Sequence, residues 1–128
     1  MAEESCRRIM VVDDDVFILE VMEELFEPEG IEVVTAESGD ACIAELEKGF
    51  RGIILMDVMM PGKDGWETIE EMLDRNLMEG NVVAMLTAKD IPDRELERIK
   101  EHVIDYITKP FEADEIVTVV KGYLDYLR

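Results

Sequence analysis

The chain has few residues that could cross-link it or build a soft-metal site. Two cysteines, Cys6 and Cys42, and one histidine, His102, occur among 128 residues. Two cysteines are too few for a disulfide framework, and none of the three residues has the spacing of a zinc site. Cys42 lies with Ile43 and Leu46 on one side of a short helical pattern, so we expect a buried thiol. We expect His102 on the surface, late in a helix.

Long apolar runs are also missing, and the N-terminus has no apolar core of a secretion signal. We therefore expect a cytoplasmic protein. Basic residues are scarce, with 13 Lys and Arg against 32 Asp and Glu, for a net charge of −19. Such a charge repels phosphate backbones and anionic membranes, which argues against direct nucleic-acid or membrane binding. Both solubility and attraction to a basic partner fit this charge, and the sequence does not choose between them.

What the chain does contain is a regular alternation of strand-like and helix-like patterns. Strands are expected near residues 7–12, 31–35, 52–56, 81–86 and 104–107. Helices are expected near residues 15–27, 38–48, 64–75, 91–101 and 112–127. Strict alternation predicts a flavodoxin-like α/β fold, a doubly wound parallel sheet of order 2-1-3-4-5 with helices on both faces. One domain over residues 1–128, with its core at about 7–127, accounts for the chain.

The first helix has an apolar stripe that we assign to Val21, Met22 and Leu25. Phe17 and Leu19 fall outside this stripe, so we expect both to be exposed. Asp15, directly before the helix, has the side chain of an N-cap.

Useful side chains follow four of the expected strands. Asp13 and Asp14 follow the first, Asp57 ends the third, Thr87 ends the fourth and Lys109 follows the fifth. Because the carboxyl ends of parallel strands share one edge of the sheet, we expect these side chains to form one site.

The acidic part of this site suits a hard divalent cation, Mg²⁺ or Mn²⁺. We expect direct ligation by Asp14, Asp57 and the backbone carbonyl of Met59, with Asp13 acting mainly through a metal-bound water. A carboxylate can attack phosphorus to give an acyl phosphate, and Asp57 is the expected nucleophile.

Three further residues would assist transfer of a phosphoryl group. The Lys109 ammonium and the Thr87 hydroxyl can each bind one phosphoryl oxygen, which leaves a third oxygen for the metal. Ala88 is small and leaves the phosphorus open to a donor.

These motifs resemble a response-regulator receiver domain of two-component signalling, of the chemotaxis-regulator-like kind. The resemblance runs from about Arg7 to Leu127 and rests on VVDDD, MDVMMPGKDG, LTA and DYITKPF. It implies that a sensor histidine kinase or phosphotransfer protein phosphorylates Asp57, with the metal held at Asp13 and Asp14. It also implies a switch pair, Thr87 and Tyr106.

The resemblance further implies a cis peptide at Lys109–Pro110 and an output face made of the fourth helix, the fifth strand and the fifth helix. The protein would be a monomer or a phosphorylation-dependent dimer. His102-Val103-Ile104 replaces the small residues usual before the fifth strand, so this chain's downstream partner does not follow from the family.

Other classes of protein are less well supported. A haloacid-dehalogenase-like aspartyl phosphatase needs an acid/base Asp two residues after the nucleophile, and Met59 stands there. A flavin or nucleotide binder would have a Gly-rich phosphate loop in place of Asp13-Asp14-Asp15. We therefore expect a signalling receiver rather than an enzyme, one that assists its own phosphorylation and loses the phosphoryl group slowly. The receiver is either free-standing or part of a longer regulator. If Phe17 and Leu19 are exposed, they could dock a helix of the kinase.

Overall fold

A computed structural model describes residues 7–87 and 102–127 and shows one five-stranded parallel sheet of order β2-β1-β3-β4-β5. The strands are β1 (Arg8–Val12), β2 (Glu32–Ala36), β3 (Ile53–Asp57), β4 (Val82–Thr87) and β5 (Val103–Thr108). The helices are α1 (Val16–Phe26), the 3₁₀ turn η2 (Glu27–Glu29), α2 (Gly39–Glu47), α3 (Gly65–Asp74) and α5 (Ala113–Leu127). The expected strand order is confirmed. The helix expected at 91–101, with Ala88 and Cys6, lies outside the described residues.

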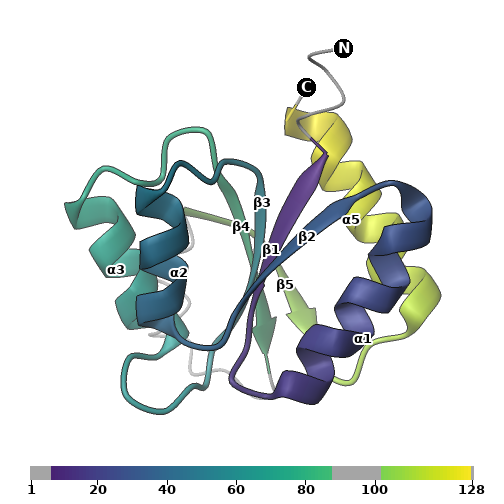
Figure 1. Ribbon diagram of the computed structural model, residues 1–128, viewed down its shortest axis with the longest axis horizontal. Coiled ribbons are helices and arrows are strands. Elements are labelled where there is room, and N and C mark those ends of the chain that lie inside the picture. Colours follow the sequence, from purple (N-terminus) through teal and green to yellow (C-terminus); the bar gives the residue numbers. More distant parts are fainter. Residues whose placement is uncertain (1–6, 88–101, 128) are drawn as a thin grey trace.

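The helices form two layers over the sheet. Figure 1 shows α1 and α5 on one face and α2 and α3 on the other. Every residue of β3 is buried, because an inner strand of such a sheet is covered on both sides. Alternate residues of the strands therefore enter two separate cores, one beneath each helix pair.

The stripe assigned to α1 was only partly correct. Its buried residues are Leu19, Met22 and Phe26, while Val21 and Leu25 are only half-buried. Leu19 is 4 % exposed, so the expectation of an exposed Leu19 is incorrect. The physical reason is Phe26, whose large ring is fully buried in the last turn and sets the buried face of the helix at the residues four and seven positions earlier, Met22 and Leu19.

Polar side chains fix where three helices begin. Asp15 accepts a hydrogen bond from the backbone N–H of Phe17 at 3.0 Å, and Ser38 accepts one from Ala41 at 3.0 Å. Asp64 and Glu67 form a reciprocal capping box at the start of α3. These caps hold the three loops that leave the carboxyl ends of β1, β2 and β3.

Of the two minor expectations from composition, the burial of Cys42 is confirmed and the exposure of His102 is not. Cys42 is fully buried, and this burial raises the pKa of its thiol to about 12, so it is an inert core residue. His102 is half-buried directly before β5 rather than fully exposed. Among residues 7–87 and 102–127, no helix has the length and apolar character needed to cross a membrane.

Candidate functional site

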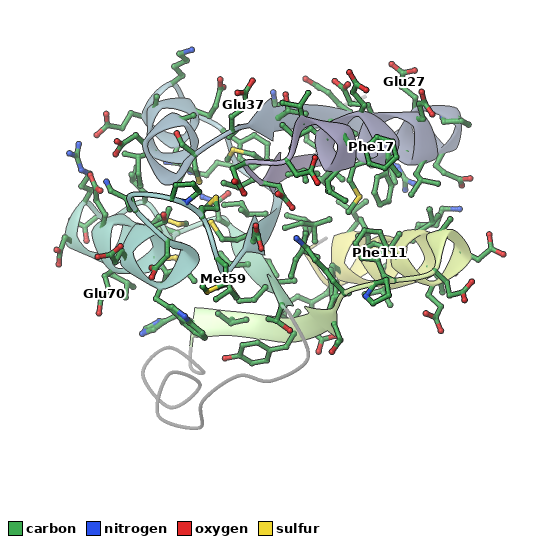
Figure 2. The ribbon with its side chains drawn as sticks, turned by 90° about the horizontal axis from the view of Figure 1, so that it is seen from below. Phe17, Glu27, Glu37, Met59, Glu70 and Phe111 are labelled. Atoms are coloured by element: carbon green, nitrogen blue, oxygen red, sulfur yellow. The ribbon has the colours of Figure 1, made fainter. Side chains whose placement is uncertain are left out.

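Three carboxylates meet at the carboxyl edge of the sheet. Asp13, Asp14 and Asp57 each place an oxygen within 4.8 Å of the others. Asp13 is 1 % exposed and Asp57 is 7 % exposed, whereas Asp14 is open to solvent. Figure 2 looks at the molecule from this end. Two acids of the site, Asp13 and Asp57, are therefore buried, and the third, Asp14, is exposed at the surface.

Lys109 closes the site from the direction of β5. Its ammonium donates to Asp13 Oδ2 at 3.0 Å and to Asp57 Oδ1 at 3.3 Å. The backbone brings it there, since the N–H of Lys109 donates to the carbonyl of Thr87 at 2.7 Å and so continues the β4–β5 ladder. The Lys109–Pro110 peptide is cis, as the resemblance implied.

The electrostatics of Asp57 follow from this crowding. Burial, and then the charge of Asp13, raise the pKa of Asp57 from its ordinary 3.8 to about 6, against the opposing effect of Lys109. Burial lowers the pKa of Lys109, but its hydrogen bond to Asp13 and the two nearby negative charges outweigh burial and raise it. One ammonium does not neutralise three carboxylates. Such a set of hard oxygen donors fits a divalent cation such as Mg²⁺.

The β3–α3 loop, residues 58–64, wraps around the same carboxylate. The backbone amide of Met59 lowers the pKa of the Asp57 carboxyl, and the N–H of Gly65 donates to the Val58 carbonyl at 2.9 Å. A Cβ on Gly65 would lie 2.6 Å from the Asp57 carbonyl oxygen, so only glycine allows α3 to begin this close to β3. The loop thereby keeps the main chain of Met59 next to the acid cluster.

Thr87 and Tyr106 lie on β4 and β5, the two strands that follow β3 in the sheet. Thr87 is 1 % exposed at the end of β4, one position beyond the residue that pairs with Asp57. Tyr106 pairs with Met85, and its hydroxyl is buried with no hydrogen-bond partner among the described residues. Burial raises the pKa of this hydroxyl. An unsatisfied buried hydroxyl costs free energy, which favours a different position of the ring, one in which the hydroxyl has a partner.

Comparison with known proteins decides the family. A family model described as the response regulator receiver domain matches residues 9–121. The chain belongs to the response-regulator receiver domains. Members of this family act as phosphoacceptors in two-component signalling. The predicted family and fold are both confirmed.

Two solved receiver structures are close in shape. A CheY-like receiver domain protein from Methanospirillum hungatei is 40 % identical, with a TM-score of 0.89 over 94 % of this chain and 96 % of its own. The Francisella response regulator 1452 receiver domain is 28 % identical, with a TM-score of 0.83 over 95 % and 99 % of the two chains.

A longer relative is matched over part of its length. The phosphate regulon transcriptional regulatory protein PhoB of Escherichia coli is 32 % identical over 118 residues, which is 92 % of this chain and 52 % of PhoB. The chain spans about half the length of the curated relatives it matches. Its likeness to PhoB therefore concerns the receiver part.

The sequence alone missed two contacts that shape the site and its surroundings. Lys63, in the β3–α3 loop, pairs with Asp40 of α2 at 2.7 Å and with Glu71 of α3. The buried Tyr123 hydroxyl of α5 donates to Asp105 Oδ2 of β5 at 2.8 Å. Charge complementarity could have suggested the first contact, but many other pairs are equally complementary in so acidic a chain. No local pattern indicates the second.

Proposed function

We propose that Asp57 is the phosphoacceptor of this receiver domain and takes its phosphoryl group from a histidine kinase or phosphotransfer protein. The observation that carries the proposal is the position of Asp57. It is a buried carboxylate at the end of β3, next to the acids Asp13 and Asp14 and within 3.3 Å of the Lys109 ammonium. Those neighbours suit the stabilisation of a more highly charged group at residue 57.

The chemistry assigned to each residue follows from this geometry. An Asp57 carboxylate oxygen forms the new bond to phosphorus, while the bond from phosphorus to the donor nitrogen breaks. Lys109 turns from the carboxylate toward the added oxygens, and the Thr87 hydroxyl donates to another. Asp13, Asp14, Asp57 and the Met59 carbonyl would hold Mg²⁺ or Mn²⁺, which when bound supplies neutralisation of the phosphoryl charge. The chain thus assists its own phosphorylation without being a turnover enzyme.

Loss of the phosphoryl group is proposed to be slow. Hydrolysis needs a water that is oriented and deprotonated beside phosphorus. Met59 stands two residues after Asp57, and its thioether neither accepts nor delivers a proton. The acyl phosphate therefore stores the signal rather than turning over.

The output is proposed to work through Thr87 and Tyr106. Movement of Thr87 toward the phosphoryl group would vacate space that the Tyr106 ring can fill, and its unpartnered hydroxyl favours such a change. Next to Tyr106, a surface groove of about 580 Å³ runs between β5 and α5. Its apolar lining includes Phe111, Ile116 and Val119. This groove is the described part of the proposed output face.

Incubation with acetyl phosphate and Mg²⁺, followed by mass measurement, tests the central assignment. The wild type should gain ~80 Da in a metal-dependent reaction, as an aspartyl phosphate requires, and Asp57→Asn should gain nothing. Asp74→Asn, on the exposed side of α3, is the matched control and should behave as the wild type. Equal mass gain in the wild type and Asp57→Asn would overturn the assignment.

The kinase is proposed to dock against Phe17. This ring is 67 % exposed at the start of α1, and Val16 beside it is 49 % exposed. Phe17→Ala should slow transfer from the kinase and leave transfer from acetyl phosphate unchanged, because the small donor needs no docking surface. Tyr126→Ala removes a similarly exposed ring from the end of α5 and serves as control. Equal slowing with both donors would place Phe17 in the chemistry instead.

A further inference from the structure

Met59 differs from the other methionines of the described chain in its exposure. Its side chain is 71 % exposed, while Met60, directly after it, is 7 % exposed. Most of the others are completely buried, namely Met10, Met22, Met56, Met72 and Met85. Met78 is half-buried. A solvent-borne reagent therefore reaches the Met59 sulfur without any opening of the fold.

Thioethers react with peroxides in a balanced two-electron step. The sulfur lone pair attacks one peroxide oxygen, the O–O bond breaks and an S–O bond forms. The sulfur is oxidised to a sulfoxide, and the second oxygen leaves as water with both protons. The product is polar and accepts hydrogen bonds, whereas the thioether is apolar.

The position of Met59 gives this reaction a consequence at the site. Met59 stands two residues after Asp57, in the loop that leaves the carboxyl end of β3, so its side chain starts next to the acid cluster. Figure 2 labels Met59 in a view from the carboxyl edge of the sheet. We propose that Met59 is a peroxide-sensitive modification site, and that its sulfoxide shortens the life of the acyl phosphate on Asp57.

The second half of this inference rests on the proposed phosphorylation of Asp57. The thioether offers no strong acceptor to a water next to the phosphoryl group. A sulfoxide oxygen accepts a hydrogen bond from that water and holds it in position for attack on phosphorus. One added hydrogen bond of ordinary net strength accelerates the decay about two- to tenfold. Peroxide would thus shorten the lifetime of the acyl phosphate on Asp57 by oxidising Met59, two residues further along the chain.

The first measurement needs no phosphorylation. The protein is treated with dilute hydrogen peroxide, and peptide mass spectrometry follows the gain of ~16 Da at each methionine. Met59 should react roughly tenfold faster than Met60 or any core methionine, since those require local opening. Comparable rates at Met59 and Met60 would overturn the modification site, whatever Asp57 does.

The second measurement follows decay of the acyl phosphate formed from acetyl phosphate. Peroxide treatment before loading should speed decay about two- to tenfold in the wild type and in Met60→Leu. Decay in Met59→Leu should not respond to peroxide, and Met59→Gln, a polar mimic, should decay faster than Met59→Leu without oxidant. Unchanged decay at full oxidation of Met59 would refute the consequence. No mass gain at Asp57 at all would instead refute the proposed function and this consequence together.

Discussion

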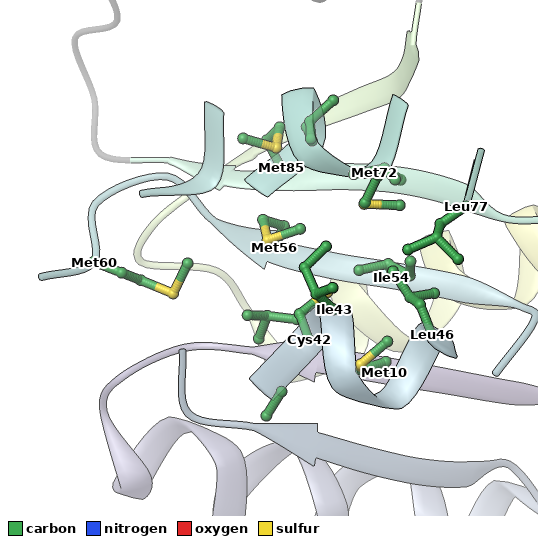
Figure 3. Close-up of a cluster of buried hydrophobic side chains, with 14 of the residues drawn as sticks. Met10, Cys42, Ile43, Leu46, Ile54, Met56, Met60, Met72, Leu77 and Met85 are labelled. Carbon is green, nitrogen blue, oxygen red and sulfur yellow. The ribbon is translucent and has the colours of Figure 1, made fainter. Parts of the chain in front are cut away.

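The two cores on either side of the sheet are built from different kinds of side chain. Beneath α2 and α3, the buried cluster contains five methionines and Cys42 (Figure 3). These are Met10, Met56, Met60, Met72 and Met85. Beneath α1 and α5, the buried cluster contains one methionine, Met22, among Ile, Leu, Val and aromatic residues. The same sheet therefore has a sulfur-rich face and a face rich in branched side chains.

This difference matches where change is expected. Methionine has three rotatable bonds and a polarisable sulfur, so it fits irregular and altered spaces, whereas Val and Ile are stiff at χ1. Tyr106, half of the proposed switch pair, packs against the sulfur-rich cluster. Met60 belongs to that cluster and to the loop around Asp57. The sulfur-rich face can adapt when the ring moves, while the α1–α5 face keeps the strands in place.

Truncation of neighbouring residues on β3 should separate the two cores most clearly. Leu55 and Met56 are both fully buried but enter opposite clusters. Leu55→Ala should lower the free energy of unfolding by about 4 kcal/mol, and Met56→Ala by about 2–3 kcal/mol, because flexible methionines fill part of the second cavity. Urea unfolding at pH 7.5 measures both values. A greater loss in Met56→Ala than in Leu55→Ala would contradict the idea that the sulfur-rich face adapts to altered spaces.

Asp57 is buried at the end of β3, and its charge should destabilise the fold. The native protein holds this proton more tightly than the unfolded chain, so the free energy of unfolding falls as pH rises from about 4 to about 6. The difference between 3.8 and about 6 corresponds to on the order of 3 kcal/mol above pH 6. Asp57→Asn should be more stable than the wild type at pH 7.5 by up to this amount.

The pH profile distinguishes this effect from a general loss of negative charge. The advantage of Asp57→Asn should disappear below about pH 4, where the wild-type carboxyl is protonated in both states. Asp74→Asn, with an exposed carboxyl, controls for overall repulsion. Mg²⁺ at constant ionic strength should stabilise the wild type and not Asp57→Asn. A wild type as stable as Asp57→Asn at pH 7.5 without metal would contradict the destabilisation assigned to the Asp57 charge.

Two tyrosine hydroxyls, one on each face of the sheet, allow a further comparison in which the expected changes in stability are smaller. Tyr106 has no partner for its hydroxyl among the described residues, while Tyr123 donates to Asp105 at 2.8 Å. Tyr123→Phe should destabilise the protein by about 1 kcal/mol, because it leaves a hydrogen bond unmade. Tyr106→Phe should be neutral or stabilising by up to about 1 kcal/mol. Thermal unfolding of the two variants checks the opposite signs, and equal losses would contradict the different roles of the two rings.

Sequence patterns predicted the strand order and the meeting of Asp13, Asp14, Asp57 and Lys109, because side chains at the ends of parallel strands share one edge whatever the details of packing. They failed on α1, where spacing alone could not show that Phe26 would turn Leu19 inward. They also gave no hint of the Tyr123–Asp105 hydrogen bond. Such contacts depend on the angle between elements, and local periodicity does not encode that angle.

The smallest expected effect concerns the outer surface of α2 and α3, above the sulfur-rich face, where ion pairs join the two helices. Lys63 pairs with Asp40 and Glu71, and its stem passes over Gly39, where an added Cβ would lie 3.0 Å from Lys63 Cδ. Lys63→Met keeps the stem and removes the charge, so it should lower Tm by only ~2 °C at low salt, as expected for a partly exposed pair. The difference should vanish in 1 M NaCl, about the concentration at which screening acts within ~3 Å. A large, salt-independent loss would mean that the close contacts of the Lys63 ammonium with Asp40 and Glu71, and not a screened surface charge, hold α2 against α3.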